Sequence, residues 1–254
     1  MKPEPFPWRL LKRVSRSFYL SLRLLPESVR ESIALAYLVA RLSDTEADGA
    51  RGAAEEELLA RKTEVLALLE ASPDRELIGQ VWSQIREGQA LDSVRFSDCR
   101  PLSGEELARY TYLVAGCVGE FWTRICAEKI PDFAREPIPE MMRMGREFGE
   151  GLQLVNILRD RHEDARIGRV YVPEERVGEA LTLARQKVAE GIAYARANRL
   201  RKLRAACLLP ALLAEATLDA IEAAPHVPRV KVSRLATMAM LVRACLAGGA
   251  KCPP

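Results

Sequence analysis

The sequence lacks the features of a membrane-spanning, nucleic-acid-binding or zinc-binding protein. No apolar run approaches the length of about 20 residues that a transmembrane helix needs. The net charge is only +3, and no basic block with interleaved aromatic residues occurs, so we expect no nucleic-acid partner. The six cysteines include no C-x-x-C pair, and the chain has only two histidines. We therefore expect free thiols in a reducing compartment.

The sequence also lacks a signal peptide pattern and strand patterns, which limits the possible localisation and fold class. The polar, proline-rich start at residues 1–7 is unlike a signal peptide, which indicates a cytoplasmic protein. Strand patterns are nearly absent, whereas helical periodicity is almost continuous and is interrupted at Pro and Gly. No linker or repeat divides the chain, so we predict one all-α domain over residues 1–254. The predicted helices lie at about 8–24, 27–48, 52–71, 74–90, 104–129, 139–163, 176–203, 206–223 and 229–248.

Two acidic pentads, each at the C-terminal end of a long predicted helix, are the most informative feature. Each contains two aspartates four residues apart, a spacing that places both on one helix face. The aspartates are Asp44 and Asp48 in the first pentad and Asp160 and Asp164 in the second. Asn156 and Gln153 extend the second polar stripe backwards. The pattern predicts two helix faces rich in oxygen ligands.

Such faces suit a magnesium-bound diphosphate. Mg²⁺ prefers oxygen ligands and is often held by one or two carboxylates together with substrate phosphates. Arg41 lies three residues before the first pentad and Arg159 adjoins the second, so guanidinium groups are available for phosphate oxygens. A single pair of this kind is usually a solvated face. Because the pair occurs twice, a metal site and two solvated faces both remain open from spacing alone.

Three other segments each allow two interpretations. The first helix has basic residues among apolar ones, so it either contacts a membrane surface peripherally or docks on the core by its apolar face. Gly116 and Gly119 inside a helix indicate close approach by another helix or by a ligand. Gly168 and Pro173 predict a loop after the second pentad. This loop contains Arg166, Arg169 and Tyr171. Because it follows directly after the second pentad, it either folds over a bound diphosphate or forms a basic surface loop.

Several ordered motifs between about Ser15 and Arg234 resemble those of one family. They are S-x-S-F and L-P within residues 15–26, Y-x-x-x-R-x-x-D-x-x-x-D at 37–48, G-x-x-x-D at 88–92, Y-x-x-x-V-A-G-x-V-G at 110–119, and Q-L-V-N-I-L-R-D followed by E-D, G-R and Y-V-P at 153–173. Together they resemble the squalene/phytoene synthase family, and most closely a bacterial-type soluble squalene synthase. Arg161 and His162 replace the small pair common in the family, and we expect them to point away from the aspartates.

The resemblance implies an all-α isoprenoid-synthase helical bundle with a central apolar cavity and the aspartate motifs facing each other at its mouth. It implies Mg²⁺ ligands at Asp44, Asp48, Asp160 and Asp164, with Asn156 and Gln153 supporting them. Diphosphate contacts would come from Arg41, Arg169, Tyr171 and Arg234. The diphosphate and first prenyl pocket would be lined by Ser15, Ser17 and Phe18. The cavity would be lined by Tyr37, Tyr110, Val114, Ala115 and Gly119.

The activity implied is head-to-head condensation of two farnesyl diphosphates, through presqualene diphosphate to squalene, with Mg²⁺ and with NADPH for the final reduction. Alternatives within the family are phytoene or dehydrosqualene synthesis, arrest at presqualene diphosphate, or hydrolysis of farnesyl diphosphate. Outside catalysis, an assembly factor of the same fold or a peripheral membrane protein on the inner face of the membrane remains open. The retained aspartates favour the enzyme. Spacing does not distinguish C15 from C20 substrates.

Overall fold

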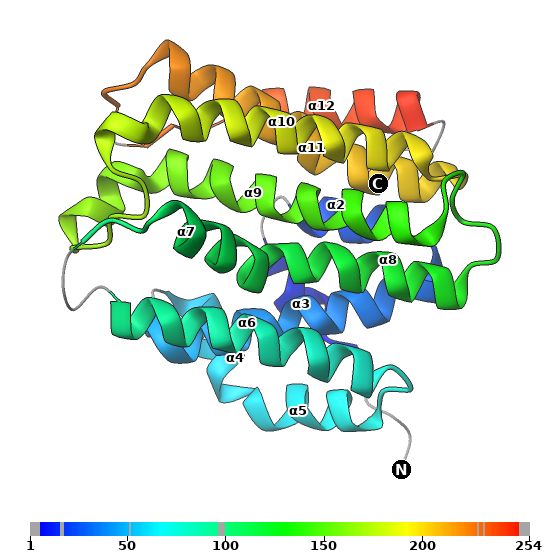
Figure 1. The fold of residues 1–254 in the computed structure, drawn as a ribbon. Coiled ribbons are helices and arrows are strands. Elements are labelled where there is room, and N and C mark those ends of the chain that lie inside the picture. Colours follow the sequence, from blue (N-terminus) through cyan, green and yellow to red (C-terminus); the bar gives the residue numbers. More distant parts are fainter. Residues whose placement is uncertain are drawn as a thin grey trace.

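The computed structural model describes residues 6–15, 18–50, 52–95, 100–227, 229–230 and 232–248, without the side chains of residues 48, 93–95 and 248. Within these residues the regular elements are helical, which confirms the all-α prediction (Figure 1). The α-helices are α1 (Trp8–Ser15), α2 (Phe18–Leu24), α3 (Glu27–Asp48), α4 (Ala53–Ala60), α5 (Lys62–Ala71), α6 (Arg75–Arg95), α7 (Gly104–Thr111), α8 (Cys117–Lys129), α9 (Ile138–Arg166), α10 (Val177–Ala197), α11 (Arg201–Ala223) and α12 (Arg234–Gly248). A π-helical turn, η2 (Tyr112–Gly116), joins α7 to α8, and a 3-10 turn, η3 (Glu174–Arg176), precedes α10.

The helices are stacked in layers around α9. In Figure 1, α10, α11 and α12 lie above α9, whereas α8, α3 and α6 lie below it. Packing follows this order, since α9 contacts α8 on one side and α10 on the other, and α3 contacts α6. The buried apolar side chains of these helices form the core. The packing around one cavity supports our proposal that residues 1–254 form one domain.

Most predicted helices are present, but several boundaries differ: the helix predicted at 74–90 extends to Arg95, and the one predicted at 52–71 is divided at Arg61. Two further differences concern α10, α11 and α12. The break predicted between 203 and 206 lies instead at residues 198–200. Asn198 is fully buried, and its side-chain amide donates to the Tyr194 carbonyl oxygen at 2.7 Å. The backbone N–H of Arg135 also donates to Ala197 at 2.8 Å, so a neighbouring loop pairs with the chain here and ends α10. The last helix begins at Arg234 rather than at 229, which leaves Arg229 outside it.

Glycines allow α8 and η2 to lie against α9 at backbone distance. A Cβ atom added to Gly119 would lie 1.8 Å from the carbonyl oxygen of Gly145. One added to Gly149 would lie 2.2 Å from the carbonyl oxygen of Ala115. Only glycine fits at such contacts, because any side chain would overlap the facing backbone. The close helix packing expected from Gly116 and Gly119 is therefore present, and Gly119 also lines the central cavity.

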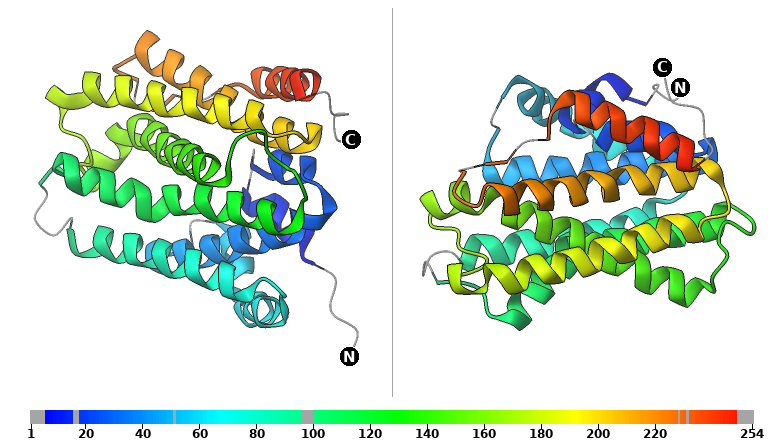
Figure 2. Two further views of the ribbon diagram at one scale, coloured as in Figure 1. Left: turned by 45° about the vertical axis from the view of Figure 1, so that its right-hand side comes forward. Right: turned by 90° about the horizontal axis from the view of Figure 1, so that it is seen from above.

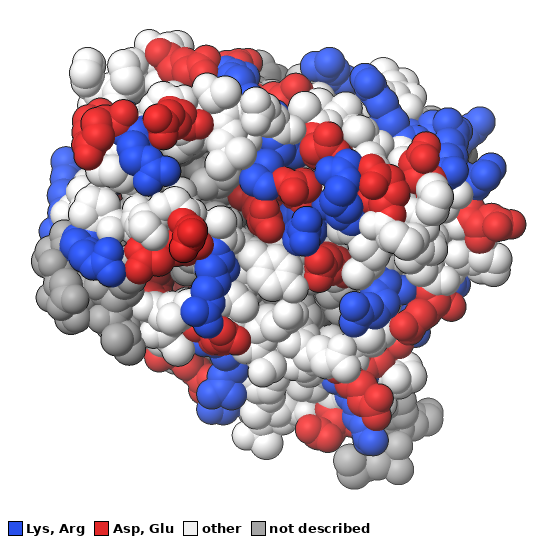
Figure 3. Space-filling view, in the orientation of Figure 1, with Lys and Arg blue, Asp and Glu red and all other residues white. Residues whose placement is uncertain are grey.

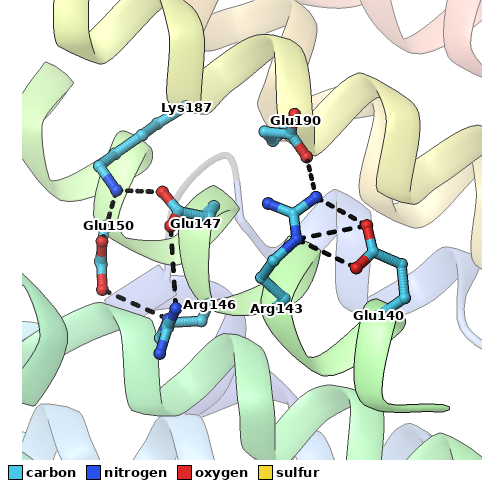
Figure 4. Close-up of polar contacts among 7 residues, drawn as sticks. All are labelled: Glu140, Arg143, Arg146, Glu147, Glu150, Lys187 and Glu190. Atoms are coloured by element: carbon cyan, nitrogen blue, oxygen red, sulfur yellow. Dashed lines mark hydrogen bonds and ion pairs between the residues drawn. The ribbon is translucent and has the colours of Figure 1, made fainter.

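Ion pairs hold α10 on the opposite side of α9. Lys187 of α10 lies between Glu147 and Glu150 of α9, with its Nζ 2.6 Å from a Glu150 carboxylate oxygen (Figure 4). Lys187 and Glu150 are only 15% and 12% exposed. Their interaction is therefore screened less than that of an exposed pair, since water has little access to either group. Packing on one side and ion pairs on the other fix the direction of α9, which carries the second acidic pentad.

The first helix is docked by its apolar face. Leu10 and Leu11 of α1 are fully buried, and Arg13 forms an ion pair with Glu57. Of the two readings of this helix, the structure shows the docked one. Among the described residues, no helix combines the length and apolar character needed to cross a bilayer. Cys117, Cys126 and Cys207 are buried free thiols, as expected.

Candidate active site

A cavity of about 880 Å³ lies at the centre of the bundle. Its polar lining comes from the C-terminal halves of α3, α6 and α9, which carry Asp44, Asp92 and Asp160 respectively. Its apolar lining comes from positions earlier in these helices and from their neighbours: Phe18, Tyr37, Phe121, Trp122, Phe148 and Tyr194. Phe148 and Asp160 are separated by about 18 Å along α9 at the usual helical rise. The cavity thus has a charged end and an aromatic end.

The first pentad contributes Asp44 to the charged end. One carboxylate oxygen of Asp44 accepts a hydrogen bond from Arg41 at 3.2 Å, and the other accepts one from Gln89 of α6. Arg41 also donates to Glu55 at 2.6 Å. The Asp44 side chain is 42% exposed, so it remains open to a ligand entering the cavity. Asp48 follows one turn later in α3, but its side chain lies outside the described residues.

The second pentad contributes Asp160 and Asp164, both of which line the cavity. Asp160 accepts hydrogen bonds from Arg159 at 3.0 and 2.5 Å and forms an ion pair with Arg229 at 2.9 Å. Arg229 also contacts Glu163 at 3.1 Å, so it spans the end of α9. These guanidinium groups give the charged end of the cavity donors of a kind that suits phosphate oxygens.

Burial and, to a smaller extent, the neighbouring carboxylate of Asp160 raise the pKa of Asp164 to about 6, against the opposing charge of Arg169. Two carboxylates one helical turn apart in a partly buried site repel each other. A bound cation would relieve this repulsion. The site therefore favours a divalent metal on electrostatic grounds.

The raised pKa predicts an unusual dependence of stability on pH. Because the folded pKa of about 6 lies above that of an ordinary aspartate, ionising Asp164 costs free energy of folding above pH 6, and the cost is relieved as the pH falls through 6. Without divalent cations, the wild type should gain thermal stability relative to Asp164→Asn as the pH falls from about 7 to about 5. Melting curves of both proteins across this range measure the difference. If the difference in melting temperature between the two proteins did not change with pH, the raised pKa of Asp164 would be contradicted.

A third acidic residue, Asp92 of α6, lies beside two tyrosines. It accepts hydrogen bonds from the hydroxyl of Tyr171 at 2.7 Å and from that of Tyr110 at 3.3 Å, and the two rings are stacked with centroids 5.2 Å apart. Burial raises the pKa of both tyrosines, and the nearby Asp92 raises it further. Both phenols therefore stay protonated and serve as hydrogen-bond donors at this end of the cavity.

The cavity brings together most residues predicted from the sequence. Its lining includes Phe18, Tyr37, Arg41, Asp44, Tyr110, Val114, Ala115, Gly119, Gln153, Asn156, Asp160, Asp164, Arg169 and Tyr171. Gln153 and Asn156 touch each other, with 3.5 Å between Nδ2 of Asn156 and Oε1 of Gln153. Their shared face confirms the predicted polar stripe.

Three residues predicted for the site are not found in the cavity lining. Two of them lie outside the cavity, and the third lies outside the described residues. Ser15 is buried and its hydroxyl donates to the Leu11 carbonyl oxygen at 2.5 Å, so it does not line the cavity. Arg234 is exposed at the first position of α12 and is likewise absent from the lining. Ser17 lies outside the described residues. His162 turns to the Pro225 carbonyl oxygen at 3.0 Å, and His162 and Arg161 do not line the cavity, as expected.

Sequence reasoning missed three residues of the charged end. Asp92 was recognised in a motif without being given a role, whereas Gln89 and Arg229 were not singled out at all. Gln89 lies one residue after Gly88 and three before Asp92, on the same helix. The G-x-x-x-D spacing was therefore the signal that could have drawn attention to this segment. No spacing pattern marks Arg229, because only the fold brings it to Asp160.

The donor set fits Mg²⁺. Asp44, Asp160 and Asp164 supply carboxylates, and Gln153 and Asn156 supply amide oxygens, all of them hard ligands. Within the described part of the chain, no three His, Cys, Asp or Glu side chains gather closely enough to hold an ion by themselves. Mg²⁺ commonly completes its shell with water and substrate phosphates, so a site of separated carboxylates suits a metal that arrives with a diphosphate.

Comparison with known proteins shows the family of the chain. The squalene/phytoene synthase family model matches residues 11–198, which is most of the chain. The chain belongs to the squalene/phytoene synthase family. Similar members are the 15-cis-phytoene synthase of Synechococcus elongatus, 30% identical over 194 residues, and the presqualene diphosphate synthase of Rhodopseudomonas palustris, 30% identical over 173 residues. The matches cover 67% and 63% of this chain but only 61% and 58% of those relatives.

Solved structures of the family share the fold. A ligand complex of TcSQS superposes with a TM-score of 0.80 at 21% identity, covering 95% of this chain and 87% of that one. A ligand complex of a dehydrosqualene synthase gives a TM-score of 0.70 at 20% identity, covering 94% of each chain. The predicted isoprenoid-synthase bundle is therefore confirmed as the fold. The relatives named here include a phytoene synthase, a presqualene diphosphate synthase and a dehydrosqualene synthase, so they differ in product.

Proposed function

We propose that the protein condenses two isoprenyl diphosphates head to head, with farnesyl diphosphate as the substrate and squalene, formed through presqualene diphosphate, as the product. The observation that carries the proposal is the division of one cavity into two chemically different ends. Carboxylates and guanidinium groups suited to metal-bound diphosphate lie at one end, and aromatic side chains suited to a prenyl chain lie at the other. Membership of the family supports the reaction class.

At the charged end, the chain holds and orients the diphosphate. Asp44, Asp160 and Asp164, with Asp48 one turn beyond Asp44, would hold Mg²⁺, which neutralises the diphosphate and makes it a better leaving group when bound. Arg41, Arg159, Arg169 and Arg229 would bind phosphate oxygens, because they lie along the same part of the lining. The hydroxyls of Tyr110 and Tyr171, which donate to Asp92 here, would turn their hydrogen bonds from Asp92 to the departing group as its charge develops.

At the aromatic end, the side chains exclude water and face the prenyl groups. When the carbon–oxygen bond of one substrate breaks, its electron pair leaves with the diphosphate and an allylic cation remains. The double bond of the second substrate would then attack this cation, and loss of a proton to the departed diphosphate would close the ring and give a cyclopropyl diphosphate. The ring faces of Phe18, Tyr37 and Trp122 stabilise nearby positive charge, and a dry cavity keeps water from capturing it.

The proposal is tested by incubating purified protein with farnesyl diphosphate and Mg²⁺, with and without NADPH, and identifying lipids by mass spectrometry. Squalene that forms only with NADPH is the expected result. A cyclopropyl diphosphate or dehydrosqualene would retain the condensation and change the product. Consumption of geranylgeranyl diphosphate alone would indicate phytoene synthesis. Farnesol alone would indicate a phosphatase, and no turnover of either substrate would refute the proposed activity in favour of an assembly factor.

Arg229 and Arg234 provide a matched test of diphosphate binding. Arg229 contacts Asp160 and lines the cavity, whereas Arg234 is exposed outside it. A hydrogen bond to a charged group contributes about 1.5–3 kcal/mol, so Arg229→Gln should lower kcat/KM for the diphosphate substrate about 10- to 100-fold. Arg234→Gln should change it by less than about threefold, as an exposed charge outside the site. Steady-state kinetics of both variants decides whether Arg229 performs the role predicted for Arg234.

A further inference from the structure

Helix α12 carries an exposed apolar stripe that the proposed reaction does not use. Leu235 is 81% exposed, Met238 51%, Val242 44% and Leu246 76%. Their spacings of three, four and four residues place all four side chains on one side of the helix. A single exposed leucine is ordinary, but four large apolar side chains in line along one helix form a patch that usually has a binding role.

A neighbouring face of α12 fixes the helix to the bundle. Leu241, Ala244 and Cys245 are buried, and α12 packs on α11. Seen from above, α12 lies on the outside of α11, and the two helices run in opposite directions, so that α12 ends near the start of α11 (Figure 2). The stripe is therefore held rigidly and faces away from the bundle.

Basic residues accompany this stripe. Helix α12 carries Arg234 and Arg243 and contains no acidic residue. The turn between α10 and α11, which lies near the end of α12, reads Arg196-Ala197-Asn198-Arg199-Leu200-Arg201-Lys202. Its four basic side chains are exposed, and so is Leu200 at 38%. Figure 3 shows Lys and Arg side chains gathered at this end of the molecule, at the upper right.

We propose that α12 and the α10–α11 turn together bind the surface of an anionic lipid bilayer. An interfacial helix inserts its apolar side chains among the lipid headgroups and places basic side chains beside anionic lipids. Each Lys or Arg near such a surface contributes about 1 kcal/mol to binding. The stripe supplies the apolar side chains that would insert. The turn supplies most of the basic side chains, with the exposed Leu200 between them.

A second copy of the chain fits this face less well. A symmetric contact through α12 would bring its basic residues into an interface to which the helix contributes no acidic partner. A 15-residue helix is about 22 Å long and about 10 Å wide, so it offers on the order of 220 Å². A stable interface needs about 800 Å² on each partner. Helix α1 fits a membrane less well too, because its apolar face is buried in the core.

The position of α11 relates this surface to the cavity. Ala206, Cys207 and Pro210 of α11 line the central cavity, while α12 packs on the same helix from outside. One helix layer therefore separates the cavity lining from the proposed bilayer contact. The bilayer contact itself does not depend on which reaction the cavity performs.

Sedimentation with lipid vesicles tests the proposal without substrate. The full chain is mixed with vesicles of phosphatidylcholine alone, or of equal parts phosphatidylcholine and phosphatidylglycerol, and the bound fraction is measured. We expect binding to the anionic vesicles only. Replacing two basic residues in Arg201→Gln/Lys202→Gln should weaken it about 30-fold. Replacing two stripe residues in Leu235→Gln/Leu246→Gln should weaken it at least about tenfold.

Matched variants control for general effects of charge and polarity. Arg75→Gln/Arg86→Gln removes two exposed charges from α6, and Leu183→Gln removes an exposed leucine from α10, so both should bind vesicles as the wild type does. Circular dichroism checks that every variant is folded. Equal binding to neutral vesicles, or unchanged binding of both test variants, would overturn the proposal. So would a dimer in analytical ultracentrifugation that Leu235→Gln/Leu246→Gln converts to monomer, since the stripe would then bind a second copy.

Discussion

Replacing Asp160 by asparagine should lower kcat/KM for the isoprenyl diphosphate by about a hundred- to a thousandfold, the range for loss of one electrostatic group at a reacting centre. Asp160 is 21% exposed, lines the charged end of the cavity, and lies between Arg159 and Arg229. Asparagine keeps the shape of the side chain but removes the negative charge that would hold Mg²⁺. The variant should fold normally, because the substitution also relieves repulsion with Asp164.

Two measurements separate this effect from a general loss of charge. Asp219→Asn removes a carboxylate that is 69% exposed and pairs with Arg185 on the outside of the bundle, so its activity should equal that of the wild type. Magnesium together with inorganic diphosphate should raise the melting temperature of the wild type and of Asp219→Asn, but not that of Asp160→Asn. If Asp160→Asn retained turnover and this stabilisation, the metal site would not include Asp160.

Periodic sequence features predicted the helices well where the local pattern agreed with the tertiary packing. The range 27–48 was predicted exactly, because Pro26 sets its start and Gly49, at a φ of +81°, lies directly after its end. The predicted helix at 52–71 is divided at Arg61 into α4 and α5, although its charge pattern is continuous. Pro210 lies inside α11 without ending it. Such interruptions depend on neighbouring helices, which local periodicity does not describe.

The candidate site was predictable to the extent that its residues repeat along one helix. Gln153, Asn156, Asp160 and Asp164 follow one face of α9, so their spacing was sufficient to group them. Arg229 could not be grouped with them, because it belongs to the segment after α11 and reaches Asp160 only when the chain folds back. For the same reason the sequence suggested Arg234 as a cavity residue, whereas Arg229 is the one that lines the cavity.

The glycine contacts between α8 and α9 also show that local sequence does not identify the tertiary partner of a residue. They lead to the substitution with the largest expected effect on stability. Helical glycines indicated a close approach, but the sequence alone did not identify Gly145 as the partner of Gly119. Gly119→Ala would place its methyl group 1.8 Å from the Gly145 carbonyl oxygen, so the two helices must separate. Overpacking of this kind costs about 3 kcal/mol, which urea denaturation should detect as a lower free energy of unfolding.

A glycine in open space provides the control for this substitution. Gly79 of α6 has no atom within 4 Å of an added Cβ, so Gly79→Ala should stabilise the protein by about 0.5–1 kcal/mol through helix propensity alone. Opposite signs for the two variants would show that packing, and not loss of glycine flexibility, determines the result at Gly119. A stable Gly119→Ala variant would mean that α8 and α9 do not meet at backbone distance. In that case α8 would not hold α9, and with it Asp160, against the aromatic wall of the cavity.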